Sequence, residues 1–424
     1  NGALNPDFDE DGYRLFGSYI DQFADGKLGV ALAVTAQSNP TQFFSRELKT
    51  NQFQTATDPA TGLIYPSDNP RSGVVSRAFE RTSVAGTLEF EPTDYFRMTA
   101  DAFYTDTEDS GIFRGVETPI ASWSGASFDS ATGSGPFADS ATYSGVVPIL
   151  RTDTEGNTAE IFAFGVNSEL DATDRLTVVF DYGISTLDRN DIDYESYAGT
   201  GGARSGLQDT QTITFNPDGT YGFQTQVDYT DPANVFLTDP GGWGQVGFLK
   251  QPKIEDELES IRLEAKYDLE NDFISGVRGG LIMTDREKSF DSNESFLRAG
   301  ADWVQTDPNN GNTRQQALSG NQIVGATNTG GMGMNILAYN PASFLTDGTY
   351  TVEKATFDTE WSVKENIDTW YAMAEIDAML GEVPVRGNIG FQYVDTTQAS
   401  TGTLNFGNTQ RLQTVTDEYT HFLP

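Results

Sequence analysis

Apolar and polar side chains alternate strictly in the middle of the chain, around residues 257–269. The apolar positions are Ile261, Leu263, Ala265, Tyr267 and Leu269. The positions between them are polar or charged. An alternation of period two places the two sets on opposite faces of a β-strand, whereas a helix would mix them. The segment therefore predicts a long strand with one face suited to hydrocarbon and one suited to water or ionic partners.

The same unit of strand, short turn and returning strand recurs along the sequence. The alternating runs predict five hairpins, at residues 11–36, 79–107, 158–187, 257–288 and 367–400. Asp25-Gly26, between two alternating runs, is the strongest of the turn signals. Long stretches rich in Gly, Ser, Thr and Asn separate most hairpins from one another. The last six residues, YTHFLP, are interpreted as the start of an eleventh strand.

The lengths of the connections predict the fold class. Short turns at one end and long loops at the other are typical of outer-membrane β-barrels, and a soluble sandwich has no reason to separate them in this way. We therefore expect an all-β, antiparallel portion of a transmembrane β-barrel, with about ten strands. Aromatic residues near the predicted strand ends fit the interfacial girdles of such a barrel. They are Tyr13, Tyr19, Phe23, Phe90, Tyr95, Phe96, Tyr182, Tyr267, Phe273 and Tyr393.

Composition narrows the function further. The net charge is -36 and the pI is near 4.1, which argues against nucleic acid as a partner. The chain has no Cys, so disulfides and thiol chemistry are excluded, and its single His, His421, leaves little material for Ser-His-Asp catalysis or a metal site. The sequence contains no run of eighteen apolar residues, so it predicts no transmembrane helix. We expect no enzymatic activity, no cofactor and no bound metal.

Several local motifs are weak on their own. Asp7, Asp9, Asp11 and Gly12 match the front of a calcium loop, but Ser18 stands where the pattern needs Glu, so an acidic turn is the preferred interpretation. The acidic run DRNDIDYE, at residues 188–195, is interpreted as a solvated loop. GTGGAR at residues 199–204 and GGMGMN at residues 330–335 lack the strand–turn–helix setting of a phosphate loop, and both are interpreted as flexible loops.

Two groups of residues are candidates for function. Charged residues on the polar strand faces are expected to face the barrel lumen or a plug: Arg97, Asp101, Arg262, Glu264, Lys266, Arg278, Glu375 and Arg386. Inward carboxylates (Glu264, Asp268, Glu375 and Asp377) offer the elements of an acid/base pair, but charged residues also line any wet barrel. Tryptophans in the loops, expected to be exposed, are candidates for stacking on sugar rings or other flat ligands. These are Trp123, Trp243, Trp303 and Trp361.

At its hairpins the chain resembles the TonB-dependent outer-membrane receptors, most closely the group from carbohydrate-scavenging proteobacteria. The resembling segments are YRLFGSYIDQFADGKLGVALAV, QPKIEDELESIRLEAKYDL with TDREKSFDSNE, and VPVRGNIGFQYVDTTQAS followed by YTHFLP. The resemblance implies a twenty-two-stranded barrel filled by an N-terminal plug and driven by an inner-membrane energy complex. The chain lacks the plug, the energy-coupling box and the terminal strands, starts without Met and stops within a predicted strand. We interpret it as a fragment of a longer precursor.

The resemblance and the strand pattern together predict import of a scarce nutrient, an oligosaccharide, across the bacterial outer membrane. The implied partners are the TonB energy-transducing complex, reached through the missing plug, outer-membrane lipid and lipopolysaccharide, and the small-molecule ligand. Three alternatives remain open: a siderophore or metal-chelate receptor of the same architecture, a passive sugar porin, and a secreted β-rich carbohydrate-binding protein or hydrolase. The last of these requires the apolar strand faces to be packed against each other.

Overall fold

The computed structural model describes residues 4–48, 54–330, 332–356, 359–406 and 409–424. These residues form an all-β protein built on one large antiparallel sheet, as predicted. Two short 3-10 turns, η1 (Ser122–Ser124) and η2 (Gly311–Thr313), are the helical elements of the described chain. None of its helices is long and apolar enough to cross a membrane.

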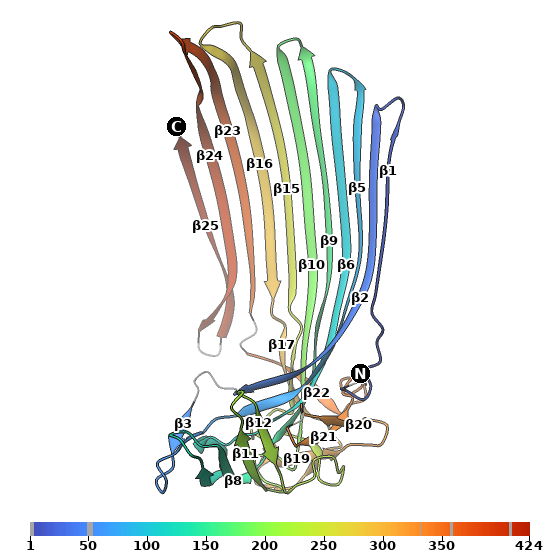
Figure 1. Ribbon diagram of the computed structural model, residues 1–424, viewed down its shortest axis with the longest axis vertical. Helices are drawn as coiled ribbons and strands as arrows, with labels where there is room; N and C mark the ends of the chain where they lie inside the picture. Colours follow the sequence, from blue (N-terminus) through green and yellow to red (C-terminus); the bar gives the residue numbers. More distant parts are fainter. Residues whose placement is uncertain (1–3, 49–53, 331, 357–358, 407–408) are drawn as a thin grey trace.

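Long antiparallel strands form the wall of the molecule, and each one pairs with the long strands on either side of it in chain order (Figure 1). They are β1 (Tyr13–Phe23), β2 (Leu28–Leu48), β5 (Pro70–Thr93), β6 (Phe96–Glu117), β9 (Ile149–Thr173), β10 (Leu176–Gly199), β15 (Lys253–Asp268), β16 (Ile274–Asp291), β23 (Glu360–Leu380), β24 (Val383–Phe406) and β25 (Thr409–Leu423). The eleventh strand, β25, begins ten residues earlier than the segment YTHFLP in which it was predicted. The short turns of the five predicted hairpins lie at the upper end of Figure 1.

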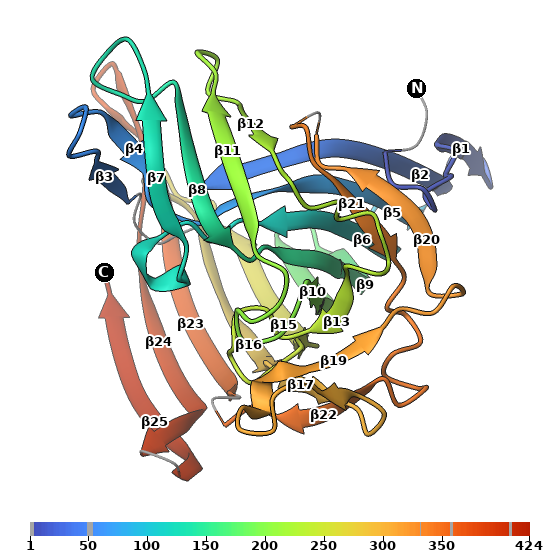
Figure 2. The same cartoon turned by 90° about the horizontal axis from the view of Figure 1, so that it is seen from below.

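The wall has two free edges. Among the described residues, β1 pairs with β2 alone and β25 with β24 alone. The sheet is therefore curved but not closed, and it leaves a row of unpaired backbone groups on each outer strand. Seen from below, the long strands follow one arc (Figure 2).

The long connections carry short strands of their own at the lower end of the wall (Figures 1 and 2). One four-stranded sheet has the order β12 (Tyr221–Gln224), β11 (Asp209–Phe215), β8 (Ser140–Val146) and β7 (Ser127–Thr132). Two smaller pairs are β3 (Thr55–Thr57) with β4 (Ile64–Pro66) and β20 (Ile323–Asn328) with β21 (Asn335–Tyr339). The remaining short strands extend the main sheet: β13 (Phe236–Thr238), β14 (Gly247–Lys250), β17 (Glu294–Ala299), β18 (Val304–Gln305), β19 (Arg314–Ala317) and β22 (Tyr350–Lys354).

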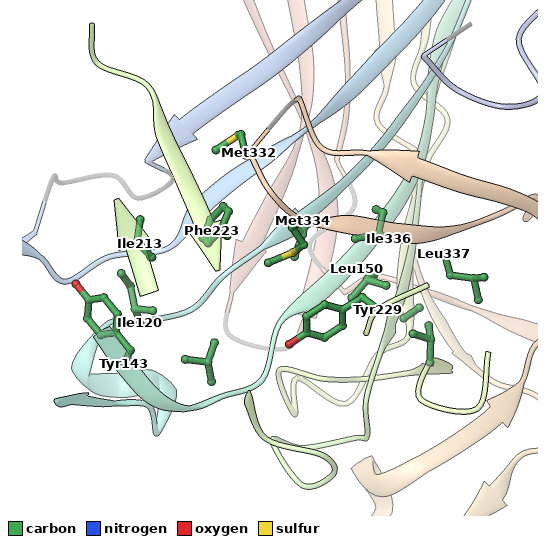
Figure 3. Packing of buried hydrophobic residues seen from close by; sticks show 14 of the residues in the cluster. Ile120, Tyr143, Leu150, Ile213, Phe223, Tyr229, Met332, Met334, Ile336 and Leu337 are labelled. Carbon is green, nitrogen blue, oxygen red and sulfur yellow. The ribbon is translucent and has the colours of Figure 1, made fainter. Parts of the chain in front are cut away.

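The apolar core of the protein lies within these long connections rather than in the wall. Buried side chains from the connections pack together with residues at the lower ends of the wall strands, and Figure 3 shows part of this cluster. Met332, Met334, Ile336, Tyr229 and Leu150 all contribute to it. The interpretation of the long connections as polar loops was therefore incomplete, because they bury enough apolar surface to fold into a packed region. We call this region the loop domain.

The wall strands are also longer than the sequence pattern indicated. β9 and β10 run from Ile149 to Gly199, where residues 158–187 were predicted as a hairpin. The extra residues at the start of β9, from Ile149 to Asp153, are buried on both strand faces. Burial on both faces removes the alternation on which a prediction of period two depends.

Candidate functional site

One face of the wall is apolar and uncovered. The paired residues show that the apolar sides of all ten consecutive long-strand pairs point the same way. Leu32, Leu263 and Ile389 on this face are 47%, 45% and 68% exposed. No second protein layer covers these positions in the described chain, so the face is available to a non-protein apolar environment.

A single row of cross-strand partner residues crosses this face from β2 to β25. Its members are Leu28, Phe90, Met98, Ser168, Phe180, Leu263, Leu281, Trp370, Tyr393 and Phe422. All but Ser168 are apolar. Leu28 is the first residue of β2 after a short turn, so it lies at the short-turn edge of the apolar face. On β23, the next residue on this face after Trp370 in the direction of the loop domain is Asp368, so Trp370 lies at the other edge. The row therefore starts at the short-turn edge of the apolar band and reaches the opposite edge at Trp370.

The slope of this row gives the tilt of the strands relative to the band. The band spans about eight residues along a strand, or about 26 Å at about 3.3 Å per residue. The row climbs this height from Leu28 to Trp370, across seven strand spacings of about 4.8 Å, which corresponds to a strand tilt of about 38°. The height of the band perpendicular to its edges is then about 21 Å, close to the ~25 Å apolar band and ~35–45° tilt of outer-membrane barrels.

Acidic residues mark the edge of the band on the loop-domain side. On several strands the apolar run on this face is followed directly by a carboxylate, as in the pairs Tyr104 and Asp106, Phe162 and Glu160, Ile261 and Glu259, Met283 and Asp285, Trp370 and Asp368, and Tyr393 and Asp395. Such an abrupt change of polarity at the same edge of successive strands is expected where hydrocarbon meets an aqueous or headgroup layer.

The opposite face of the wall carries ion pairs that cross between strands. Arg262 on β15 contacts Asp181 on β10 at 2.9 Å. Arg278 on β16 lies 3.6 Å from Glu264 on β15 and 3.1 Å from Glu375 on β23. Glu264 also accepts a hydrogen bond from the Tyr371 hydroxyl. Ion pairs on the side away from the apolar band therefore link each neighbouring pair of these four strands.

The remaining predicted lumen residues lie on the same face, each with a neighbouring polar partner. Lys266 contacts Asp268 at 3.4 Å and Glu375 at 3.9 Å. Arg97 contacts Glu169 at 2.7 Å, and Arg386 contacts Asp377 at 3.2 Å. The Thr87 hydroxyl donates a hydrogen bond to Asp101 at 2.5 Å. The sheet thus supplies its own partners for the charges predicted to face the lumen or a plug, including the carboxylates Asp268 and Asp377.

A second charged cluster, which the sequence did not reveal, is buried where β6, β9 and β10 enter the loop domain. The Arg151 guanidinium contacts Glu117 at 2.6 Å, Asp153 at 2.9 Å and Glu195 at 2.9 Å. Arg71 contacts Asp153 from the other side at 3.0 Å. Burial raises the pKa of the Asp153 carboxyl, against the attraction of these two guanidinium groups. We call Arg151 and its three carboxylates the Arg151 cluster.

Several motif interpretations need correction. The run DRNDIDYE lies within β10 rather than in a solvated loop, and its Glu195 belongs to the Arg151 cluster. Asp7, in the predicted acidic turn, forms an ion pair with the buried Arg114, which the sequence did not indicate. Hydrogen bonding to Arg114 lowers the pKa of Asp7. No group of three or more His, Cys, Asp or Glu side chains arranged to hold a metal occurs in the described ranges.

The described residues of the two glycine-rich segments pack into the loop domain, where flexible loops were predicted. The backbone N–H groups of Ala203 and Arg204 donate to the carbonyls of Asp239 and Pro240 at 2.7 and 2.9 Å. In GGMGMN, Met332 and Met334 are core residues, while Gly331 lies outside the described residues. The two buried methionines pack this segment into the core, although its polar, glycine-rich sequence did not predict a buried segment.

The four candidate tryptophans have different environments. Trp123 and Trp243 are exposed in the loop domain, as expected. Trp361 is partly exposed and stacks on Phe290 with ring centroids 5.8 Å apart. The expected exposure of Trp303 was wrong: the ring is 6% exposed, and its Nε1–H donates to the Thr349 carbonyl at 2.8 Å. Trp303 is a core residue of the loop domain. Its burial is tolerated because the indole N–H, its single polar group, has a hydrogen-bond partner there.

Comparison with known proteins adds little to this description. No family model matches the sequence, and no curated protein matches it either. Among solved structures, the siderophore receptor PirA from Pseudomonas aeruginosa aligns over 97% of this chain and 80% of its own, at 9% identity and a TM-score of 0.09. A likeness at that score carries no argument about fold or ligand.

Proposed function

We propose that this chain forms part of the wall of a bacterial outer-membrane β-barrel that imports a nutrient, an oligosaccharide, with energy supplied through TonB. The observation that carries the proposal is the oblique, uncovered apolar band. Its height and the strand tilt deduced from it match the dimensions of outer-membrane barrels. A secreted carbohydrate-binding protein or hydrolase of similar size would need to cover this face with protein, so the band disfavours that alternative.

The packed loop domain supports a receptor in preference to a general diffusion pore. It gathers the connections at one end of the wall into a folded unit with exposed aromatic side chains, which is suited to selective capture of a ligand. In this proposal the polar network around Arg278 lines the interior of the barrel. The plug and the energy-coupling segment that such import requires would be contributed by sequence outside residues 1–424, and no catalytic role is assigned to the chain.

Uptake by cells expressing the complete protein tests this function. A fluorescently labelled oligosaccharide too large for general porins should enter the periplasm, and a protonophore or deletion of tonB should abolish its entry. Entry that persists after either treatment would identify a passive porin. Energised uptake of a ferric chelate, with no uptake of oligosaccharide, would establish the siderophore receptor instead.

A further inference from the structure

Three segments of the loop domain that are far apart in sequence form one continuous surface around Arg204. The Arg204 guanidinium lies over the Trp123 ring at 5.5 Å, and its Nη1 donates to the Trp123 carbonyl at 2.6 Å. Its backbone N–H donates to the Pro240 carbonyl, in the turn that carries Trp243. Asn312 joins the same surface, because its Nδ2 donates to the Gly242 carbonyl at 3.0 Å. The two exposed candidate tryptophans therefore flank an arginine.

The turn that presents Trp243 is rigid. The Asp239 carboxylate is buried and accepts backbone N–H bonds from Gly242, Trp243 and Gly244 at 2.8, 3.0 and 2.6 Å. Tyr197 packs against the indole at 5.6 Å and 72°. A side chain at Gly241 would collide with the indole, since an added Cβ would lie 2.4 Å from Trp243 Cε2. An exposed aromatic ring that is already fixed loses little conformational entropy when a ligand stacks on it.

A cleft of about 230 Å³ adjoins this turn, lined by Asp239, Gly244, Val246, Arg298, Ala299, Gly311, Asn312 and Arg314. Its volume is below the ~300–1,000 Å³ of pockets that enclose a whole ligand, so it suits a single ring of a larger one. Two guanidinium groups, those of Arg298 and Arg314, and the Asn312 amide line the cleft. Planar groups of this kind recognise hydroxyl and carboxylate oxygens by paired hydrogen bonds.

The arginines of this surface stand out in an acidic chain. The chain has 62 acidic and 26 basic residues, and at least twelve arginines of the described chain form ion pairs with carboxylates. Arg298 is one of them, through Glu353 at 2.9 Å. Within the part of the chain that the structure describes, neither Arg204 nor Arg314 has such a partner, and both are exposed. Their positive charge is free for an anionic ligand.

We propose that this surface binds an oligosaccharide that carries carboxylates, a uronate-type chain. Trp123 and Trp243 stack on sugar rings, Arg204 and Arg314 pair with the carboxylates, and the cleft holds one ring. The inference rests on the proposed function and names its substrate class. Stacking alone would accept neutral sugars equally well, so the unpaired arginines are what favour an acidic chain.

Binding by the complete protein in detergent tests the inference. Intrinsic tryptophan fluorescence is titrated with a galacturonate tetrasaccharide and with maltotetraose, using the wild type, Trp243→Ala and the double variant Arg204→Gln/Arg314→Gln. Arg14→Gln is the matched control, since Arg14 is an exposed arginine on β1 without an ion pair among the described residues. Circular dichroism and the thermal unfolding midpoint verify that each variant is folded.

The galacturonate tetrasaccharide should bind the wild type more tightly than maltotetraose does. The double variant should lose at least about tenfold in affinity for galacturonate, the scale of a lost charge-assisted hydrogen bond, while Arg14→Gln changes it by less than about twofold. Equal binding of both sugars, affinity unchanged in the double variant, or no binding of galacturonate would each overturn the inference. None of these results bears on the energised uptake that tests the function itself.

Discussion

The Arg151 Nη1 lies 2.6 Å from Glu117 Oε1, and both side chains are almost completely buried. Glu117 is the last residue of β6 and Arg151 is near the start of β9. The contact therefore joins the two ends of the long connection between these strands. Asp153 and Glu195 complete the Arg151 cluster. Removing one member of a buried ion pair leaves the opposite charge buried without a partner, which strongly destabilises the folded state.

Removal of Arg151 should therefore destabilise the loop domain strongly. Arg151→Met leaves buried carboxylates without a counter-charge, and we expect a loss of about 3–5 kcal/mol in the free energy of unfolding. Arg189→Gln is the control, because Arg189 pairs with Asp191 at 2.7 Å on the surface and should cost less than about 1 kcal/mol. Denaturant titrations in detergent measure both. Equal effects of the two substitutions would contradict the structural role of the cluster.

The Asp7–Arg114 ion pair should make the attachment of the N-terminal segment depend on pH. Because Arg114 lowers the pKa of Asp7 below 3.8, the stabilisation is present above pH 3.8 and is lost as the pH falls through the lowered value. The thermal midpoint of the wild type should exceed that of Asp7→Asn at pH 7, and the difference should vanish in strong acid. Exposed Asp9, replaced by Asn, should show no difference at either pH. A difference between wild type and Asp7→Asn that persists in strong acid would show that the ion pair is not its cause.

Replacement of Trp303 should destabilise the protein far more than replacement of Trp243. Trp303→Ala removes a buried ring and the partner of the Thr349 carbonyl, so it should cost about 3–5 kcal/mol of stability. Trp243→Ala removes a ring that is 47% exposed and should cost much less. Denaturant unfolding followed by far-ultraviolet circular dichroism compares the two. A stable Trp303→Ala protein would argue against the packing of the loop domain.

A charge placed on the apolar face should be far more damaging than one on the polar face. Leu263 lies within the band, one apolar position in from Ile261 at its acidic edge, and Leu263→Arg should cost about 2 kcal/mol in a bilayer. Ser260→Arg, on the opposite face of the same strand, should be tolerated. The measurement is the free energy of folding into lipid vesicles. If Ser260→Arg costs as much as Leu263→Arg, the assignment of the two faces is wrong.

The two faces of the wall could be predicted from sequence because strand alternation is a local property. The positions of Leu263 and Arg262 relative to the sheet follow from their spacing alone. The loop domain could not be predicted in the same way. Met332 and Met334 are buried by residues more than a hundred positions away, although the apolar runs GVVPIL and NILAY within the long connections were a usable signal.

The Arg151 cluster required information that spacing does not contain. Glu117, Arg151 and Glu195 come together only because β6, β9 and β10 pair in one particular register over their whole length. The same holds for Trp303. The polar sequence around it predicted an exposed side chain, but its contacts with Tyr350 and Thr349 bury it in the core. Pairings between distant segments decide both.

Site-directed spin labelling along β15 tests the central claim most directly. Residues 1–424 contain no cysteine, so a single cysteine introduced at one of residues 260 to 266 is the one labelling site within this part of the chain. In the complete protein reconstituted into bilayers, labels at 261, 263 and 265 should be accessible to oxygen dissolved in lipid. Labels at 260, 262, 264 and 266 should be shielded from it. Loss of this alternation, or exposure of 261, 263 and 265 to a water-soluble relaxation agent, would contradict a lipid-facing wall.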